Sequence, residues 1–215
     1  MKLLFIGNSH TFYNAMPQMV RELFAAVGQK VHVTMLAAAG KDLGYHATSH
    51  NVAFNVRYGE YDFVIAQERV SGFDPLSLRD SAKILKDMSD RAGAAFYLYM
   101  PWTARGDRAG QRAMTDGYHR FCRENGCFFA PAGEVFSRLL AHPAAAEKLY
   151  REDGKHAALF GSYAAALTVF YTVTGRKRII KVTDIEDPGV RLGIPAELCQ
   201  LAHTEACRTM RLYNG

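Results

Sequence analysis

Three side chains of the kinds that carry out acyl transfer stand out in the sequence. Ser9 lies in KLLFIGNSHTF, where an apolar run breaks into polar residues. Asp153 and His156 lie three residues apart in EDGKHAALFGSY, a spacing at which one turn of chain brings a carboxylate and an imidazole onto the same side. A serine becomes a nucleophile when a histidine takes its proton and a carboxylate orients that histidine. Considered alone, such a pair more often has a structural use, with Asp153 as a helix N-cap and His156 as a surface residue.

The elements that must position these residues follow from the alternation of apolar runs and helical patterns. Strands are predicted at 3–7, 30–37, 61–67, 94–100 and 127–131. Helices are predicted at 15–28, within 75–93, and at 110–126, 161–175 and about 195–212, and residues 40–55 are irregular or helical. The first helix is expected to be capped by Asn14 and to end at Gly28. Continuous apolar strands that alternate with helices are typical of a parallel sheet covered on both faces. We therefore expect one α/β domain over residues 1–215, a three-layer α/β/α sandwich with five parallel strands. Ligands bind beyond the carboxyl ends of such strands, where Ser9, Gly40 and Gln67 are expected to lie.

The two polar stretches together resemble the first and last sequence blocks of the SGNH hydrolase superfamily, serine esterases and lipases also known by a Gly-Asp-Ser-Leu motif. FIGNSHT follows the first predicted strand and DGKHAALFGSY precedes a late helix, and the resemblance spans residues 3–175. It is greatest to a branch that opens with Gly-Asn-Ser and carries Gly-Ser-Tyr soon after the histidine. The resemblance implies a flavodoxin-like α/β/α fold and a catalytic triad of Ser9, Asp153 and His156, with no cofactor or metal.

Acyl transfer also needs donors for the oxyanion of the tetrahedral intermediate. The family uses the N–H of the serine, a glycine after the second strand and an asparagine after the third. The resemblance implies Gly40 as this glycine, with Gly44 as the weaker alternative. The segment DFVIAQERVSG departs from the family because it has no asparagine, and Gln67 is the predicted substitute, since a carboxamide N–H is the group required. Alternatively, Gln67 is a polar strand end and Glu68 pairs with an arginine such as Arg69.

Two aromatic residues are predicted to line a pocket near the serine. Trp102 follows the fourth predicted strand, and Tyr45 lies in the segment after the second strand, with Tyr13 as a further candidate. An exposed aromatic ring can stack on a sugar or hold an acyl chain, although an aromatic beside a proline is as often a packing residue.

Three histidines outside the proposed triad receive no catalytic role. His46 and His50 have the i, i+4 spacing of metal ligands, but no third ligand is apparent, so no metal site is expected. His10 is either a polar wall of the site or a surface residue.

Composition narrows the classes of function further. The net charge is +5, but the basic residues are scattered apart from GRKRIIK at 175–181, which is typical of a solvated helix end, so nucleic-acid binding is not expected. The four cysteines show no zinc spacing and indicate buried thiols in a reducing compartment. No stretch approaches the length of a membrane span, and the first apolar run is too short for a signal peptide. We expect a cytoplasmic protein without a membrane partner, and the sequence makes no prediction of its oligomeric state.

These observations favour a serine hydrolase that cleaves a small carboxylic ester through an acyl-enzyme on Ser9. An O-acetylated carbohydrate is the first candidate substrate, by family analogy. The alternative is a ligand-binding protein on the same fold that has little or no turnover.

Overall fold

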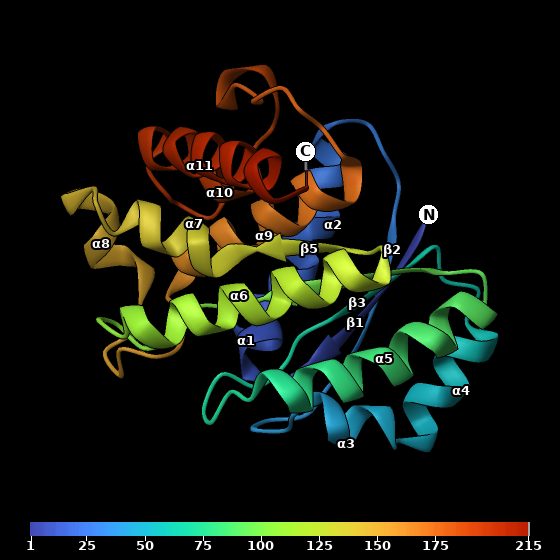
Figure 1. Cartoon of the computed structure of the whole chain (residues 1–215). Coiled ribbons are helices and arrows are strands. Elements are labelled where there is room, and N and C mark those ends of the chain that lie inside the picture. The colour runs from blue at the N-terminus through green and yellow to red at the C-terminus, as the bar shows by residue number, and fades with distance from the viewer. Residues whose placement is uncertain (215) are drawn as a thin grey trace.

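Five parallel strands form the centre of the computed structural model, which describes residues 1–214 (Figure 1). The strands are β1 (Lys2–Gly7), β2 (His32–Ala37), β3 (Phe63–Ala66), β4 (Ala95–Met100) and β5 (Phe128–Pro131), in the order β2-β1-β3-β4-β5. The predicted five-stranded parallel sheet is therefore confirmed. The strand that precedes Ser9 pairs with β2 on one side and β3 on the other, so its end is held from both sides.

Helices cover both faces of this sheet (Figure 1). One face carries α2 (Met16–Ala26), α7 (Ala132–Leu139), α8 (Pro143–Leu149), α9 (Leu159–Thr174) and α11 (Ala196–Asn214), and the other carries α3 (Leu43–Ala47), α4 (His50–Tyr58), α5 (Pro75–Arg91) and α6 (Arg108–Asn125). The short elements are α1 (Ser9–Phe12), α10 (Pro188–Arg191) and the 3-10 helices η1 (Tyr13–Ala15) and η2 (Val182–Asp184). Within residues 1–214, none of the helices is both long enough and apolar enough to cross a membrane.

The side chains of β1 explain why the sheet is buried on both faces. Leu3 and Phe5 point into the core under α2 and α9, whereas Leu4 and Ile6 point into the core under α5 and α6. All four side chains are fully buried. Successive side chains of a strand point to opposite faces, so an uninterrupted apolar run is what a strand between two helical layers needs.

The start of α2 differs from the prediction. Asn14 does not cap this helix, because the cap position is Ala15 and no side chain bonds to the first turn. Asn14 and Ala15 instead have left-handed backbone conformations, with φ of 52° and 51°, so the chain kinks between α1 and α2. The predicted end at Gly28 is confirmed by its φ of 75° just beyond the helix. Both α7 and α8 fall in a stretch for which no element was predicted.

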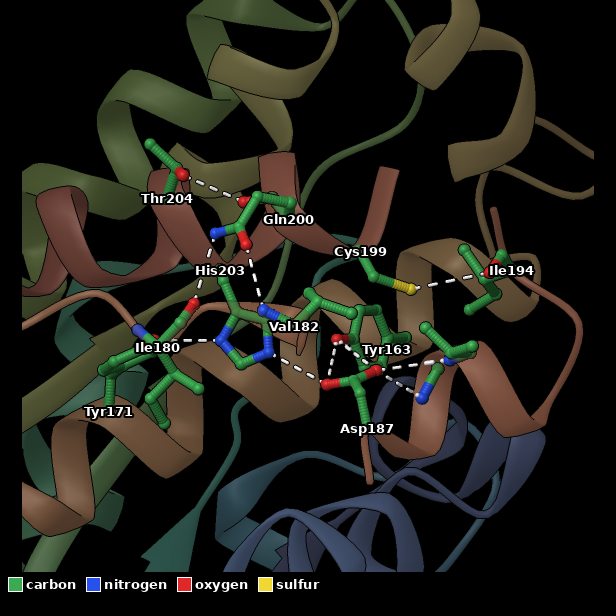
Figure 2. A network of polar contacts seen from close by, with 12 residues as sticks. Tyr163, Tyr171, Ile180, Val182, Asp187, Ile194, Cys199, Gln200, His203 and Thr204 are labelled. Carbon is green, nitrogen blue, oxygen red and sulfur yellow. Dashed lines mark hydrogen bonds and ion pairs between the residues drawn. The ribbon is translucent and has the colours of Figure 1, made fainter. Parts of the chain in front are cut away.

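A buried polar network anchors the irregular segment between α9 and α11 (Figure 2). The carboxylate of Asp187 accepts hydrogen bonds from the Tyr163 hydroxyl at 2.8 Å and contacts Nε2 of His203 at 2.9 Å. The other ring nitrogen of His203 lies 2.9 Å from the Tyr171 hydroxyl, which in turn accepts the N–H of Ile180. Because a buried charge is tolerated only when it is paired, this network fixes the segment to both helices.

Candidate active site

Ser9 is held at the end of β1 by the first turn of a helix. Asn8 is the N-cap of α1, and its side-chain oxygen accepts the N–H of His10 at 3.1 Å. Its Nδ2 donates to the carbonyl of Lys41 at 2.9 Å, which ties this turn to the loop after β2. The Ser9 backbone is therefore fixed between two neighbouring strands, and its N–H lies at a helix N-terminus, where anions are favoured.

Gln67 supports the same turn and does not face the cavity. Its Oε1 accepts the N–H of Asn8 at 3.0 Å and the Thr11 hydroxyl at 2.9 Å, and its Nε2 donates to the carbonyl of Glu68. The side chain is fully buried. Because the carboxamide is buried and does not line the cavity, the prediction of Gln67 as an oxyanion donor is corrected: in this structure the residue positions Ser9 through Asn8 and Thr11. The longer side chain reaches back under β1, which the sequence could not reveal.

Asp153 and His156 lie on the loop between α8 and α9, and His156 contacts Ser9 at the carboxyl ends of the strands. The Ser9 hydroxyl lies 3.0 Å from Nε2 of His156, and Nδ1 of His156 lies 2.6 Å from Oδ2 of Asp153. Oδ1 of Asp153 accepts the backbone N–H groups of Lys155 and His156 at 2.8 and 2.9 Å. These bonds, above all the one from the His156 ring, hold the pKa of Asp153 well below its usual range. The structure thus brings the three residues of the predicted triad together.

Asn14 joins the two halves of this site. Its Nδ2 donates to the carbonyl of Ala157 at 3.1 Å and to the Ser162 hydroxyl at 2.9 Å. The left-handed backbone of Asn14 and Ala15 turns this side chain toward α9. Unusual backbone conformations of this kind persist where the surrounding structure imposes them. The kink that replaces the predicted cap therefore links the Ser9 segment to the residue after His156.

Ser9 and His156 open into a cavity of about 350 Å³ at the carboxyl ends of the strands. Loops after β1, β2, β3 and β4 and the Asp153 loop contribute its walls, with Asn8, Ser9, His10, Gly40, Arg69, Val70, Ser71, Gly72, Ala104, Asp107, Lys155 and His156 as lining residues. Gly40 has a φ of 70°, which glycine adopts without strain. Within residues 1–214, the N–H groups of Ser9 and Gly40 donate to no protein acceptor. The fold therefore uses neither of these two N–H groups.

His10 lines this cavity beside the triad. Its ring centroid lies 5.4 Å from that of His156 and 5.2 Å from that of Trp102. Burial, together with the neighbouring His156, lowers the pKa of His10 to about 4, so the ring is neutral at pH 7. The sequence left this residue without a role, and its position next to Ser9 was the only signal.

The aromatic residues lie elsewhere than expected. Trp102 is buried and does not line the cavity; its indole N–H donates to the carbonyl of Lys155 at 2.8 Å and its ring stacks on Phe136 at 4.0 Å. Tyr45 is half exposed, lies outside the cavity and packs against Lys41. The Tyr13 ring packs edge-on against the His156 ring, with 4.6 Å between the ring centroids. The expectation that Trp102 and Tyr45 line the pocket is therefore corrected, because one ring supports the loop from below and the other faces outward.

His46, Glu68 and Arg69, which the sequence analysis also considered, make contacts within the protein. Nε2 of His46 lies 2.8 Å from the carbonyl of Gly7, and this bond fastens α3 to the end of β1. The guanidinium of Arg69 pairs with Asp42 at 3.7 Å rather than with Glu68. Oε1 of Glu68 accepts two backbone N–H groups, and burial raises the pKa of this carboxyl. The Glu68–Arg69 ion pair, which was the alternative interpretation of this segment, is therefore not formed.

Solved structures of SGNH lipases and esterases share this fold, as the sequence resemblance predicted. No protein-family model and no curated protein sequence matches the chain. Structural similarity extends over 99% of the chain to a DUF4886 family protein from Bacteroides uniformis, of which 95% is covered, with 20% identity and a TM-score of 0.77. An acetyl xylan esterase, AlAXEase, is similar over 80% of this chain and 100% of its own, with 12% identity and a TM-score of 0.68. A family 3 carbohydrate esterase from Clostridium thermocellum is similar over 81% and 96%, with 11% identity and a TM-score of 0.65.

Proposed function

We propose that the protein is a serine hydrolase that cleaves a small carboxylic ester through an acyl-enzyme on Ser9. The observation that carries this proposal is the unbroken chain of contacts from the Ser9 hydroxyl to His156 and on to Asp153, at 3.0 and 2.6 Å. An isolated serine, histidine or aspartate has many structural uses. A serine that contacts a histidine, which in turn contacts a carboxylate, at the mouth of a cavity has the geometry of an activated nucleophile.

The reaction begins when His156 accepts the proton of Ser9 and the serine oxygen attacks the ester carbonyl. Asp153 orients the imidazole and stabilises its positive charge. The N–H groups of Ser9 and Gly40 stabilise the oxyanion, and removal of one such donor typically costs about 2.7–4 kcal/mol. His156 then gives its proton to the leaving alcohol, and water that it activates releases the acyl group from Ser9. The chain's own side chains supply every proton transfer in this route.

For the substrate we propose a short acyl ester, with an O-acetylated carbohydrate as the first candidate. A cavity of about 350 Å³ suits an acetyl or butyryl group together with part of its alcohol. Two of the structurally similar proteins are a carbohydrate esterase and an acetyl xylan esterase, which supports acetate as the acyl group. The lining residues Arg69, Asp107 and Lys155 supply polar groups for a hydroxylated alcohol.

The test is the initial rate of hydrolysis of p-nitrophenyl acetate, butyrate and octanoate by the wild type and by Ser9→Ala. We expect turnover that falls with acyl length and that disappears in Ser9→Ala. Ser137→Ala is the matched control, because the Ser137 hydroxyl bonds only to its own helix, outside this cavity. Equal rates in wild type and Ser9→Ala would mean adventitious hydrolysis and would reject the proposal. Release of acetate from acetylated xylo-oligosaccharides then tests the carbohydrate.

The engagement of Gln67 favours a second candidate, a binding protein with little turnover. Without this carboxamide, Ser9 and Gly40 supply the two donors described above, whereas the family uses three. Stoichiometric labelling by a fluorophosphonate separates the two candidates, because it requires an activated serine. Labelling that Ser9→Ala abolishes supports the hydrolase, and absence of labelling in a folded wild type supports the binding protein.

A further inference from the structure

Two cysteine sulfurs meet where α6 ends and β5 begins. Sγ of Cys122 lies 3.3 Å from Sγ of Cys127. Gly126 has a left-handed conformation with φ of 62°, and the carbonyl of Cys122 accepts the N–H of both Gly126 and Cys127. The bond from Gly126 is that of an αL helix end, and the bond from Cys127 is the 6→1 bond of a Schellman helix end. In such an end the side chain of the residue that offers the carbonyl, here Cys122, comes into contact with that of the residue after the glycine, here Cys127. The backbone itself therefore holds the two thiols together.

A small oxidant can reach this pair from solvent. Both cysteines line a surface cavity of about 340 Å³ together with His119, Arg123 and Gly126. Cys127 is half-buried, whereas Cys122 is 4% exposed. The cavity lies at the C-terminal end of α6, and the Ser9 cavity lies near its N-terminal end, on the order of 25 Å away for a helix of this length. The thiol pair is therefore separate from the candidate active site.

The surroundings distinguish the two thiols. The hydrogen-bonding contact with the Cys122 sulfur, aided by the charge of Lys86, lowers the pKa of Cys127 although burial opposes the shift. The same contact and burial raise the pKa of Cys122. Because the thiolate is the reactive form of a cysteine, Cys127 is the one that an oxidant attacks first.

We propose that Cys122 and Cys127 form a peroxide-reactive dithiol, with Cys127 as the attacking sulfur and Cys122 as its resolving partner. The Cys127 thiolate attacks one oxygen of hydrogen peroxide, the O–O bond breaks, and a sulfenic acid and hydroxide form. The Cys122 sulfur then displaces the hydroxyl of the sulfenic acid, so that an S–S bond forms and water leaves. In total, two thiols are oxidised, one peroxide is reduced and two waters are produced. The disulfide would link the end of α6 to the residue before β5.

The test uses the full-length protein, reduced and freed of reductant, with stoichiometric hydrogen peroxide. We expect the wild type to fall from four titratable thiols to two, with a mass loss of about 2 Da that dithiothreitol reverses. Trypsin cleaves after Arg120, Arg123 and Arg138, so the bond would join peptide 121–123 to peptide 124–138. Four thiols after treatment, or a bond between Cys199 and Cys207, would overturn the proposal.

Three variants assign the roles. Cys122→Ser is expected to retain a sulfenic acid on Cys127 that dimedone traps, because the resolving thiol is gone. Cys127→Ser is expected to keep its three thiols, because Cys122 is buried and disfavours the thiolate. Cys207→Ala is the control, and it should still lose two thiols. Equal trapping in Cys122→Ser and Cys127→Ser would contradict the assignment. These readouts are independent of hydrolysis, so the dithiol and the proposed esterase succeed or fail separately.

Discussion

At the scale of single residues, the contact between Asp153 and His156 determines what Ser9 can do. Asp153 uses one oxygen for two backbone N–H groups and the other for the imidazole, so its orientation is fixed before it meets His156. The bond to Nδ1 leaves Nε2 of His156 to accept the serine proton. The depressed pKa of Asp153 means that this carboxylate stays ionised at neutral and mildly acidic pH.

Asp153→Asn is therefore expected to lower kcat/KM by roughly 10³–10⁴-fold, because an amide facing Nδ1 favours the wrong tautomer of His156. The loss should lie in kcat, with KM little changed, since Asp153 does not line the cavity. Initial rates on p-nitrophenyl acetate measure it, with circular dichroism as the control for folding. A fall of less than about tenfold would show that Asp153 is only a turn residue.

The buried ring of His10 is expected to make the free energy of unfolding depend on pH. Its pKa is about 4 in the folded chain and 6.5 in the unfolded chain, so the unfolded state binds more protons between these values. The stability due to the neutral ring is complete above pH 6.5 and falls as the pH drops toward 4, by at most about 3 kcal/mol. His10→Phe should flatten this dependence in urea unfolding at pH 7 and 4.5. His142→Phe, at an exposed position, should leave the pH dependence of the unfolding free energy unchanged. A pH dependence in His10→Phe as steep as that of the wild type would contradict the prediction.

At the scale of secondary-structure elements, continuous apolar runs predicted the strands well. LLFI in β1 is buried on both faces, so its pattern and its environment agree. α7 and α8 had no prediction although α7 packs in the core through Val135 and Phe136. The two helices have only 8 and 7 residues, which is shorter than the stretch over which apolar periodicity identifies a helix. Asn14 looked like a cap because asparagine prefers that position, but its bonds to α9 depend on residues far along the chain.

The candidate site was predictable only where it depends on local sequence. The Ser9, Asp153 and His156 motifs are local, and so is the glycine turn at Gly40. The direction in which a long side chain points is not local: Gln67 turns toward the backbone that carries Ser9, and Trp102 turns into the core beneath Lys155. The roles assigned to the triad and to Gly40 remain predictions for the kinetic experiments.

The Asp187 network predicts how the segment between α9 and α11 is stabilised. Asp187→Asn is expected to destabilise the fold by about 2–4 kcal/mol, because Tyr163 and His203 lose a buried ionised partner. Burial raises the pKa of Asp187, but the hydrogen bonds from His203 and Tyr163 outweigh it and hold the pKa below its usual value. Its contribution is therefore present above about pH 4 and is lost as the pH falls through the lower folded value.

Urea unfolding at pH 7 measures this effect. Asp184→Asn, an exposed aspartate on the same segment, should change stability by less than about 0.5 kcal/mol. Hydrogen exchange adds a local readout, since the N–H groups of Gly189 and Val190 that bond to Asp187 should exchange faster in Asp187→Asn. Identical unfolding curves for the two variants would show that the network adds no stability.

At the scale of the whole molecule, the site joins residues from distant parts of the chain. Ser9 and His156 are 147 positions apart, and the sheet order places β1 between β2 and β3 rather than at an edge. Ser9 follows a strand of the sheet, and helices pack on both faces of that sheet. The proposed esterase activity and the global structure should therefore be lost together.

We expect the loss of activity in urea to coincide with the loss of far-ultraviolet circular dichroism, as one cooperative transition. This result would also support the prediction of a single domain over residues 1–215. The reversible control is dilution out of urea, which should restore both signals. Loss of activity at a clearly lower urea concentration would instead indicate that the Asp153 loop opens separately from the sheet.

The distance between nucleophile and base has a consequence while the chain is being made. His156, the base in the proposed mechanism, is synthesised 147 residues after Ser9. At about 5–20 residues per second, the serine spends on the order of ten seconds as an ordinary hydroxyl, without a base. Under the proposed mechanism, the nascent chain carries no activated serine until the loop before α9 has been added, so an incomplete chain would not attack esters or inhibitors.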